Sequence, residues 1–188
     1  FAKEYMYKPR LDEDTLAGDF IAMAMGSAAD LCIVPMQDYL ELGSEARINT
    51  PSTLGDNWKW RMSAEQLSPE LAEEMSSIIG QESRAVGITS AMSPVIDVSR
   101  DPRWGRTYET YGEDQYLISQ MGIHYVRGMQ NQGVSCIAKH FLGYAETQAG
   151  LNTATTRLND RELYEVFATP FEAADKEAGL DAMMANYA

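Results

Sequence analysis

Apolar residues in the second part of the chain occur in two patterns, short continuous runs and longer stretches with a helical period. Apolar residues recur three or four positions apart in the stretches predicted as helices, residues 68–86, 113–130 and 160–178. Short apolar runs bounded by turn residues are predicted as buried strands, residues 88–98, 134–138 and 182–185. The order strand, helix, strand, helix, strand indicates a parallel sheet covered by helices. We therefore predict an α/β fold.

The sequence also predicts the ends and buried faces of these helices. Ser68 and Pro69 form a helix start, with a capping hydroxyl and a proline at the first helical position. Asn159 and Glu162 form a similar start of the capping-box type, and Pro170 should kink or split the helix that follows. The residues expected on the buried faces are Leu71, Met75, Ile78, Ile79, Ala85 and Val86, then Leu117, Met121, Tyr125 and Met129, then Leu163, Val166, Phe167, Phe171 and Ala174.

The first part of the chain has a less regular pattern. Residues 13–29 are predicted as a helix, residues 31–36 as a short apolar strand, and residues 39–60 as a loop-rich segment broken by glycine and proline. Cys32 and Cys136 lie in apolar runs without CxxC spacing, so both are expected to be buried free thiols.

Polar residues follow the ends of successive predicted strands. They are Asp97 and Arg106, then Lys139 and His140, then Asn186 and Tyr187. In a (β/α) barrel these strand ends share one rim, where chemistry takes place, and an open doubly wound sheet would also bring them to one edge. A complete barrel has roughly 250 residues and eight strands, whereas this chain has 188 residues. We therefore predict an incomplete (β/α) TIM-type barrel, with parallel strands and covering helices.

Charge and composition narrow the possible partners. The 15 basic and 28 acidic residues give a net charge of −13, so no nucleic-acid or anionic-membrane partner is expected, and a neutral ligand fits better. No apolar run reaches the ~20 residues that span a bilayer. The two histidines are not spaced as metal ligands, so no metal or cofactor is expected, and His124 should be exposed. The ends at Phe1 and Ala188 suggest a segment of a longer protein.

The loop with the densest chemistry is residues 93–114, SPVIDVSRDPRWGRTYETYGED. It places Trp104 between arginines and among several carboxylates. An aromatic ring covers the apolar face of a sugar while arginine forks bind its hydroxyls, which points to sugar binding by Trp104 and an adjacent arginine. In the alternative interpretation, Arg–carboxylate pairs lock the loop, and such pairs would also pre-position an arginine that faces a substrate. Asp97 is expected to anchor this loop.

Lys139 and His140 form the second candidate group. An ammonium and an imidazole side by side at a strand end offer several hydrogen-bonding groups to one small volume. The lysine disfavours a charged His140, and a neutral ring suits hydroxyl binding better than proton transfer. The alternative is a surface lysine beside a core histidine.

At these residues the chain resembles a known family. Residues from about 67 to 188 resemble the N-terminal barrel domain of glycoside hydrolase family 3, the β-glucosidase and β-xylosidase family, through SPVIDVSRDPRWGRTYETYGED, AKHFLGY, GLNTATTRLNDREL and MMANYA. The resemblance implies that Arg106, Lys139 and His140 bind hydroxyls of the sugar at the cleavage site and that Tyr187 lies near the nucleophile. KHFLGY with NTATT resembles the β-glucosidase branch. The parent protein is therefore expected to hydrolyse O-glycosidic bonds of an oligosaccharide or β-glucoside with retention.

The same resemblance implies that the catalytic carboxylates lie outside this chain. The nucleophilic aspartate of the family is expected beyond Ala188 and its acid/base glutamate in a later domain. Glycoside cleavage generally needs both groups, and the residues present single out no convincing nucleophile. No catalytic residue is therefore assigned here, and the 188-residue chain alone is expected to be inactive.

The first part of the chain resembles a different family. Residues from about 3 to 66, above all PMQDYLELGSEARINTPSTLGDNWKWR, are similar to the C-terminal end of 4-α-glucanotransferase, glycoside hydrolase family 77. This implies that Asp38, Arg47, Asn49 and Pro51 belong to a loop beside a glucan site, with the catalytic carboxylates upstream of Phe1. The chain is thus predicted to join two parts, residues 1–66 from the tail of one barrel and residues 67–188 from the head of another.

Two further functional hypotheses follow from these features. The parent protein could be an α-glucan transferase acting on α-1,4-glucans, an interpretation that rests on the first part of the chain alone. It could also be a non-catalytic sugar-binding module that uses Trp104, Arg106, Lys139 and His140.

Overall fold

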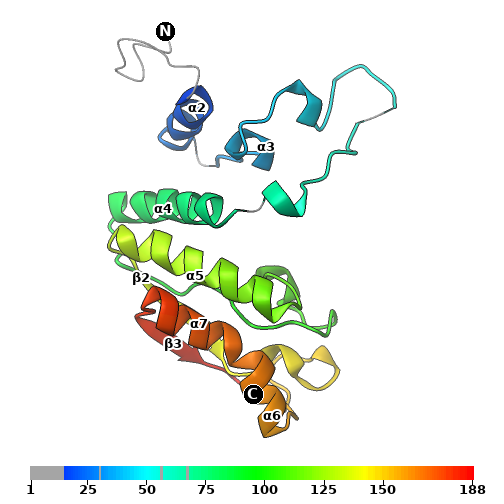
Figure 1. The fold of residues 1–188 in the computed structure, drawn as a ribbon, viewed down its shortest axis with the longest axis vertical. Helices are drawn as coiled ribbons and strands as arrows, with labels where there is room; N and C mark the ends of the chain where they lie inside the picture. The colour runs from blue at the N-terminus through cyan, green and yellow to red at the C-terminus, as the bar shows by residue number, and fades with distance from the viewer. Residues whose placement is uncertain (1–14, 30, 56, 67) are drawn as a thin grey trace. The chain divides into compact units, whose positions relative to one another are not determined.

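The computed structural model describes residues 15–29, 31–55, 57–66 and 68–188 (Figure 1). The chain divides into two compact units, Phe1–Leu67 and Ser68–Ala188, which are described separately. The first residues of the predicted helix at 13–29, and the start of the resemblance to family 77, lie outside the described residues.

The first unit contains short helices joined by irregular segments. Helix α2 spans Leu16–Met25 and α3 spans Met36–Tyr39, and the 3-10 turns η2 and η3 span Ser44–Ala46 and Ala64–Gln66. The strand predicted at residues 31–36 is wrong, because this segment is extended and unpaired and then turns into α3. An apolar run becomes a strand only where a neighbouring strand completes its hydrogen bonds, and the described part of this unit holds none. Cys32 is accordingly exposed, against the prediction.

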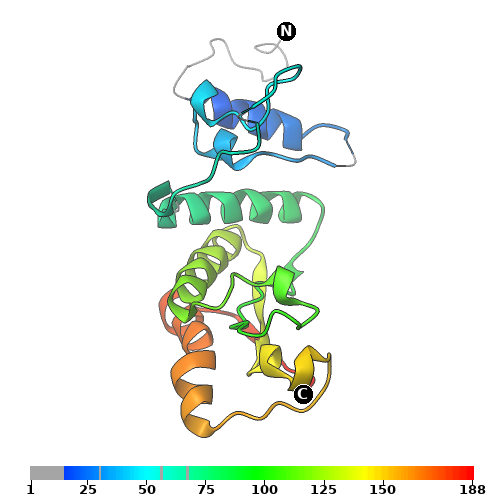
Figure 2. The same cartoon turned by 90° about the vertical axis from the view of Figure 1, so that its right-hand side faces the viewer.

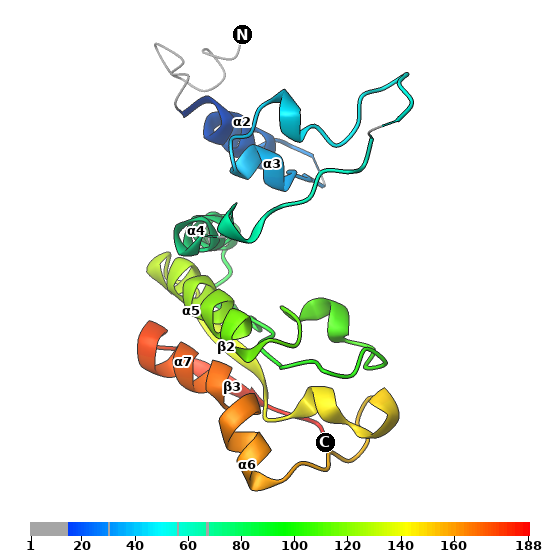
Figure 3. The ribbon, with the colours of Figure 1, turned by 45° about the vertical axis from the view of Figure 1, so that its right-hand side comes forward.

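The second unit is built on a parallel sheet. Its strands are β1 (Ser90–Ala91), β2 (Ser135–Phe141) and β3 (Ala182–Ala185), in the order β1-β2-β3, and both pairings are parallel. The intervening elements are α4 (Pro69–Ala85), η4 (Thr107–Glu109), α5 (Gln115–Asn131), η5 (Tyr144–Glu146), η6 (Gln148–Gly150), α6 (Asp160–Glu162), the π-helical turn η7 (Leu163–Phe167) and α7 (Thr169–Ala178). Figures 1 and 3 show α5 and α7 side by side over one face of the sheet. The predicted α/β fold of an incomplete barrel is confirmed.

The first predicted strand, residues 88–98, forms only in pieces. Ser90 and Ala91 pair with β2, and pairing resumes at Val95, which bridges to Lys139. Between them lies Pro94, which has no N–H to donate to a ladder. Strand β2 is longer than predicted, because it includes Lys139 and His140 near its carboxyl end and finishes at Phe141.

The predicted helix starts are confirmed. Ser68 Oγ accepts a hydrogen bond from the backbone N–H of Leu71 at 3.1 Å. Asn159 Oδ1 accepts from the backbone N–H of Glu162 at 2.9 Å, and Asn159 Nδ2 donates to the Glu162 carboxylate at 2.8 Å. Pro170 lies at the start of α7, and the helical stretch is split there into α6, η7 and α7, as predicted.

The predicted buried faces of two helices are partly wrong. In α4 the buried residues are Ser76 and Gly80, whereas Ile79 and Val86 are exposed. In α5 Met129 is buried as predicted, whereas Leu117 is exposed and its neighbour Ile118 is buried. The full buried set of α5 is Ile118, Ser119, Gly122, Ile123, Val126, Gly128 and Met129. Small residues let α4 lie close to α5, so the contact face is set by size and not by hydrophobicity.

One hydrophobic core lies between the sheet and the helices. Its buried members come from β2, from α5, η7 and α7, and from the segments next to the strands, namely Ile96, Val98, Ile118, Val126, Met129, Val134, Cys136, Ala138, Phe167, Phe171, Ala174 and Leu180. Cys136 is buried as predicted, and burial raises the pKa of its thiol to about 12. The buried residues Cys136, Ala138 and His140 of β2 anchor the middle strand of the sheet in this packed unit.

Candidate functional site

Three segments meet at the carboxyl end of the sheet. Figure 3 shows the loop after β1 (green), the loop after β2 (yellow) and the C-terminal residues on the same side of the sheet, and Figure 2 shows the C-terminus beside the yellow loop. This follows from the parallel pairing, which brings successive carboxyl ends to one edge. The candidates Arg106, Lys139, His140 and Tyr187 all lie on these segments.

Arg106 is held in a fixed orientation by two partners. Its Nε and Nη2 donate to the two carboxylate oxygens of Glu109 at 2.6 and 2.8 Å, and its Nη1 lies 2.8 Å from His140 Nε2. The guanidinium holds the pKa of Glu109 below its usual range, with smaller contributions from Lys139 and His140. Tyr144 also lies within reach of this guanidinium. Arg106 is therefore a permanent cation that its neighbours hold in one orientation.

His140 is buried and bound on both sides of its ring. Its backbone N–H and its Nδ1 both approach Asp97 Oδ2, each at 2.9 Å, and the two side chains are 1% exposed. The expectation that Asp97 anchors the arginine-rich loop is wrong, because its carboxylate is committed to His140. The carboxylate of Asp97, which comes from the segment beside β2, therefore holds the ring of His140 in place.

Lys139 lies on the same strand end as His140. It is half-buried, and its backbone N–H donates to Pro94 O at 3.0 Å while its carbonyl accepts from Ile96 N at 3.0 Å. Its ammonium is close enough to Glu109 to help lower the pKa of that carboxyl. The ammonium thus shares one electrostatic neighbourhood with Arg106 and His140.

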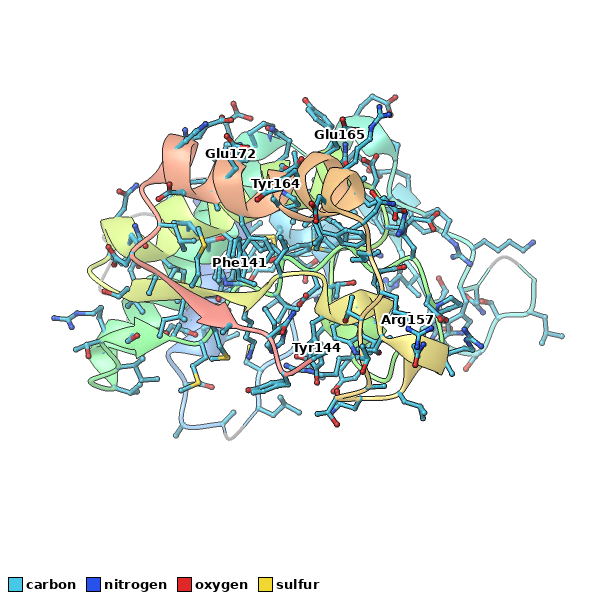
Figure 4. The ribbon with its side chains drawn as sticks, turned by 90° about the horizontal axis from the view of Figure 1, so that it is seen from below. Phe141, Tyr144, Arg157, Tyr164, Glu165 and Glu172 are labelled. Carbon is cyan, nitrogen blue, oxygen red and sulfur yellow. The ribbon has the colours of Figure 1, made fainter. Side chains whose placement is uncertain are left out.

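Aromatic rings line the other side of the site. The buried Tyr144 ring makes edge contacts with Trp104 at 5.2 Å, His140 at 4.9 Å and Tyr187 at 5.4 Å between ring centroids, and Tyr144 lies beside the end of β3 in Figure 4. Tyr187 is 57% exposed and its ring lies 5.6 Å from that of His140. Trp104 is 1% exposed, so the expectation that it covers a sugar face is wrong; it supports Tyr144 from below.

The arginine-rich loop also contains structural ion pairs, as the alternative interpretation predicted. Arg103 pairs with Asp101 at 2.7 Å and lowers the pKa of Asp101 to about 2. Arg100 pairs with Glu146 at 3.2 Å and lies over the ring of Phe167. Both interpretations therefore hold for this loop, since some arginines lock it and Arg106 faces the strand ends.

Other candidates lie elsewhere. Asp38 belongs to the first unit, where it is exposed on α3 and lines a groove of about 730 Å³ together with α2. His124 is partly buried and not exposed as predicted, because its Nδ1 lies 3.4 Å from Glu73 across the α4–α5 contact. The sequence reasoning missed Glu109 and Tyr144. Glu109 could have been found from its i,i+3 spacing to Arg106, and Tyr144 from its place as the last residue of the AKHFLGY motif that contains Lys139 and His140.

The Arg106–Glu109 pair makes stability depend on pH. The pKa of Glu109 is lower in the folded protein than its ordinary value of 4.5, so the pair stabilises the fold fully above about pH 4.5 and is lost as pH falls through the lower, folded pKa. We expect Glu109→Gln to reduce the free energy of unfolding by about 1.5 kcal/mol at pH 7.

Urea unfolding of the wild type and of Glu109→Gln between pH 3 and 7 measures this effect. The difference between the two proteins should shrink below about pH 4.5. Taking the difference removes the titration of the other carboxylates, including Asp101. A difference that stays constant with pH would show that the pair is not formed in solution.

Two features are absent from the described residues, a cluster of metal-binding side chains and a membrane-spanning helix. No group of three or more histidine, cysteine, aspartate or glutamate side chains is arranged to hold a metal ion. No helix in the same part of the chain has both the length and the apolar character needed to cross a bilayer.

The fold and the site define the class of protein. It is an α/β protein with parallel strands, and its charged and aromatic side chains gather at the carboxyl ends of these strands. Residues 50–188 match the N-terminal domain of glycosyl hydrolase family 3, so the chain belongs to this family. Residues 1–67 match 4-alpha-glucanotransferase. Both resemblances inferred from the motifs are confirmed, and the two matched ranges overlap at residues 50–67.

Named relatives agree with the first match. A beta-xylosidase from Formosa agariphila is 43% identical over 128 residues, which cover 63% of this chain and 18% of that protein. A beta-glucosidase from Rhizobium radiobacter is 33% identical over 119 residues, which cover 63% of this chain and 14% of that protein. The chain therefore spans less than a fifth of the length of these relatives.

Solved structures show the same relationship. The beta-glucosidase from Listeria innocua superposes with a TM-score of 0.61 at 32% identity, over 64% of this chain and 18% of that chain. A β-glucosidase from Erythrobacter marinus gives a TM-score of 0.62 at 32% identity, over 64% of this chain and 17% of that chain. The neighbours support the predicted incomplete barrel.

Proposed function

We propose that this chain supplies the sugar-gripping part of the active site of a retaining β-glycosidase. In this proposal Arg106, Lys139 and His140 bind the hydroxyls of the pyranose at the bond to be cleaved, and the exposed ring of Tyr187 borders that sugar. The observation that carries the proposal is the 2.8 Å approach of Arg106 Nη1 to His140 Nε2, which joins the loop after β1 to the end of β2 although the two residues are 34 positions apart in sequence. A cluster of fixed donors beside an aromatic ring suits a neutral, polyhydroxylated ligand.

The carboxylates beside the site do not suit catalysis. Glycoside cleavage with retention uses two carboxyl groups about 5–5.5 Å apart, one of them a free nucleophile. Asp97 is buried and bound to His140, and Glu109 is bound by both arms of Arg106. We therefore assign both to the support of the binding groups, and assign nucleophile and acid/base to other carboxylates of the whole protein.

The ligands of a structural relative suggest the substrate class. The Listeria innocua beta-glucosidase has been solved with glucose, gluconolactone, isofagomine and laminaribiose. These compounds share a six-membered ring with hydroxyl groups around it. We propose a β-glucoside or a related oligosaccharide as the substrate of the whole protein.

The domain assignment remains part of this proposal. Residues 1–66 are proposed to derive from a 4-α-glucanotransferase-like barrel and residues 67–188 from the family 3 domain. The two family matches and the division into compact units after Leu67 support this assignment.

A second function is favoured by the match of residues 1–67 alone. That match supports an α-glucan transferase, with Asp38 in a loop beside the glucan site. Incubating the whole parent protein with maltotriose separates the two proposals, because a transferase produces longer maltooligosaccharides whereas a β-glycosidase leaves maltotriose unchanged.

Calorimetric titration of the chain with glucose, gluconolactone and isofagomine tests the first proposal. We expect binding by the wild type and loss of detectable binding in Arg106→Ala, because the guanidinium orients the other binding groups. Arg103→Ala is the matched control, since Arg103 lies on the same loop but is exposed and paired with Asp101. The proposal fails if the wild type binds none of these sugars, or if Arg106→Ala binds them as tightly as Arg103→Ala.

A further inference from the structure

The buried carboxylate of Asp97 contacts the proposed sugar-binding groups only through His140. Its Oδ2 lies 2.9 Å from both the backbone N and Nδ1 of His140, and Oδ1 has no protein partner. The side chain is 1% exposed and sits below the ring of a residue that is itself buried. An acid in this position is too deep to reach a sugar and is placed to orient a group that does.

The two hydrogen-bond partners of the His140 ring determine which of its nitrogens carries the proton. A carboxylate only accepts hydrogen bonds and a guanidinium only donates them. Nδ1 must therefore carry a proton to donate to Asp97, and Nε2 must carry a lone pair to accept from Arg106 at 2.8 Å. Because Asp97 is anchored by the backbone N–H of His140, the acid cannot turn away without losing both bonds.

We infer that Asp97 is a positioning residue that fixes His140 in the Nδ1-protonated form, so that Nε2 acts as a hydrogen-bond acceptor beside the donor groups of Arg106. The tautomer is assigned from the identity of the two partners. Tyr144 restrains the same ring from its edge, with centroids 4.9 Å apart. Asp97 thus supports His140 of the sugar-binding motif, although the two residues are 43 positions apart in sequence.

The arrangement specifies what a ligand must offer, and this consequence rests on the proposed function. A hydroxyl that inserts between Arg106 Nη1 and His140 Nε2 breaks the 2.8 Å hydrogen bond between them, accepts from the freed N–H of the guanidinium and donates to the freed lone pair of Nε2. A fluorine at the same position can accept but not donate, and a hydrogen can do neither. The site is therefore selective for a sugar hydroxyl that serves as donor and acceptor together.

Nitrogen-15 NMR of the histidine rings tests the positioning role without any ligand. For His140 of the wild type near neutral pH we expect a protonated, pyrrole-type Nδ1 and an unprotonated, pyridine-type Nε2. The chain has two histidines, so His124→Gln assigns the signals and His124 serves as an internal reference. A wild-type His140 that is protonated at Nε2 would overturn the inference, whatever the sugar titrations show.

Variants of Asp97 then show that the acid controls the tautomer. Asp97→Ala should shift His140 toward the Nε2-protonated form and weaken gluconolactone binding at least about tenfold, the loss expected for one hydrogen bond. Asp97→Asn should largely restore both, because its amide oxygen still accepts from Nδ1. Asp101→Asn, a carboxylate removed from the same loop, should change neither.

The outcomes separate this inference from the proposed function. If the wild type binds no sugar while His140 has the expected tautomer, the proposed function fails and the positioning role stands. If Asp97→Ala does not fold, the wild-type tautomer and Asp97→Asn still decide the question. Unchanged tautomer and affinity in a folded Asp97→Ala would overturn the positioning role.

In the sugar series, we compare glucose with its deoxy and deoxyfluoro analogues at each hydroxyl. At one position, replacement by fluorine should weaken binding nearly as much as replacement by hydrogen, by about tenfold or more. If fluorine is tolerated at every position, the donor requirement at His140 is wrong.

Discussion

Replacing Trp104 by alanine is expected to lower the free energy of unfolding of the second unit by about 3–5 kcal/mol. The indole is 1% exposed and packs against the buried Tyr144 and Ala145. Its removal would leave a cavity directly beneath the ring that contacts His140 and Tyr187. We expect the stability loss to be accompanied by weaker sugar binding, because Tyr144 would lose its support.

Urea unfolding followed by circular dichroism measures this effect. Trp104→Phe is the matched control, since it keeps an aromatic edge against Tyr144 and removes the indole N–H, which is buried without a protein partner. This control should cost about 1 kcal/mol. If Trp104 instead stacked on a sugar, alanine would abolish binding while leaving the unfolding curve unchanged, and that result would contradict the buried position.

Replacing Gly128 by alanine is expected to destabilise the same unit by about 3 kcal/mol. A β-carbon at this position of α5 would lie 2.4 Å from Ser76 Cβ, 2.7 Å from the carbonyl oxygen of Glu73 and 2.8 Å from the backbone N of Ser77. Two of these neighbours are backbone atoms of α4, so the strain cannot be relieved by turning a side chain. The helices would have to move apart.

The chain offers two checks on this interpretation. Gly105→Ala should leave stability within about 0.5 kcal/mol, because nothing lies within 4 Å of its added β-carbon. Adding Ser76→Gly to Gly128→Ala should recover part of the loss, since it removes the nearest of the clashing atoms. Thermal unfolding of the wild type and these three variants is the measurement, and a Gly128→Ala protein as stable as Gly105→Ala would show that α4 and α5 are not in close contact in solution.

The two predictions concern parts of the unit with different tasks. The α4–α5 contact joins two helices and contains none of the site residues, whereas Trp104 packs against Tyr144 and supports the site directly. Figure 4 shows Tyr164, Glu165 and Glu172 on the outer side of η7 and α7, and Tyr144 on the opposite side, near the end of β3. Gly128→Ala should therefore reduce stability with sugar affinity unchanged in the folded fraction, in contrast to Trp104→Ala.

Local chemistry in the sequence determined the order and ends of most elements. The caps at Ser68 and Asn159 and the break at Pro170 depend on hydrogen bonds or steric clashes within a few residues, so they can be read without a structure. The same holds for the arrival of Arg106, Lys139 and His140 at successive strand ends, because parallel order alone brings those ends to one edge. The sequence motifs were sufficient to identify the family.

Only the tertiary structure decided which faces are buried and what supports the site. Ile79 is exposed and Gly80 buried because α4 meets another helix at close range, and the unpaired run after α2 is no strand because it has no neighbour. Contacts between residues tens of positions apart in sequence bury Trp104 against Tyr144 and pair Asp97 with His140. Such contacts depend on the shape of the whole core, and a local pattern of apolar and polar residues does not contain that information.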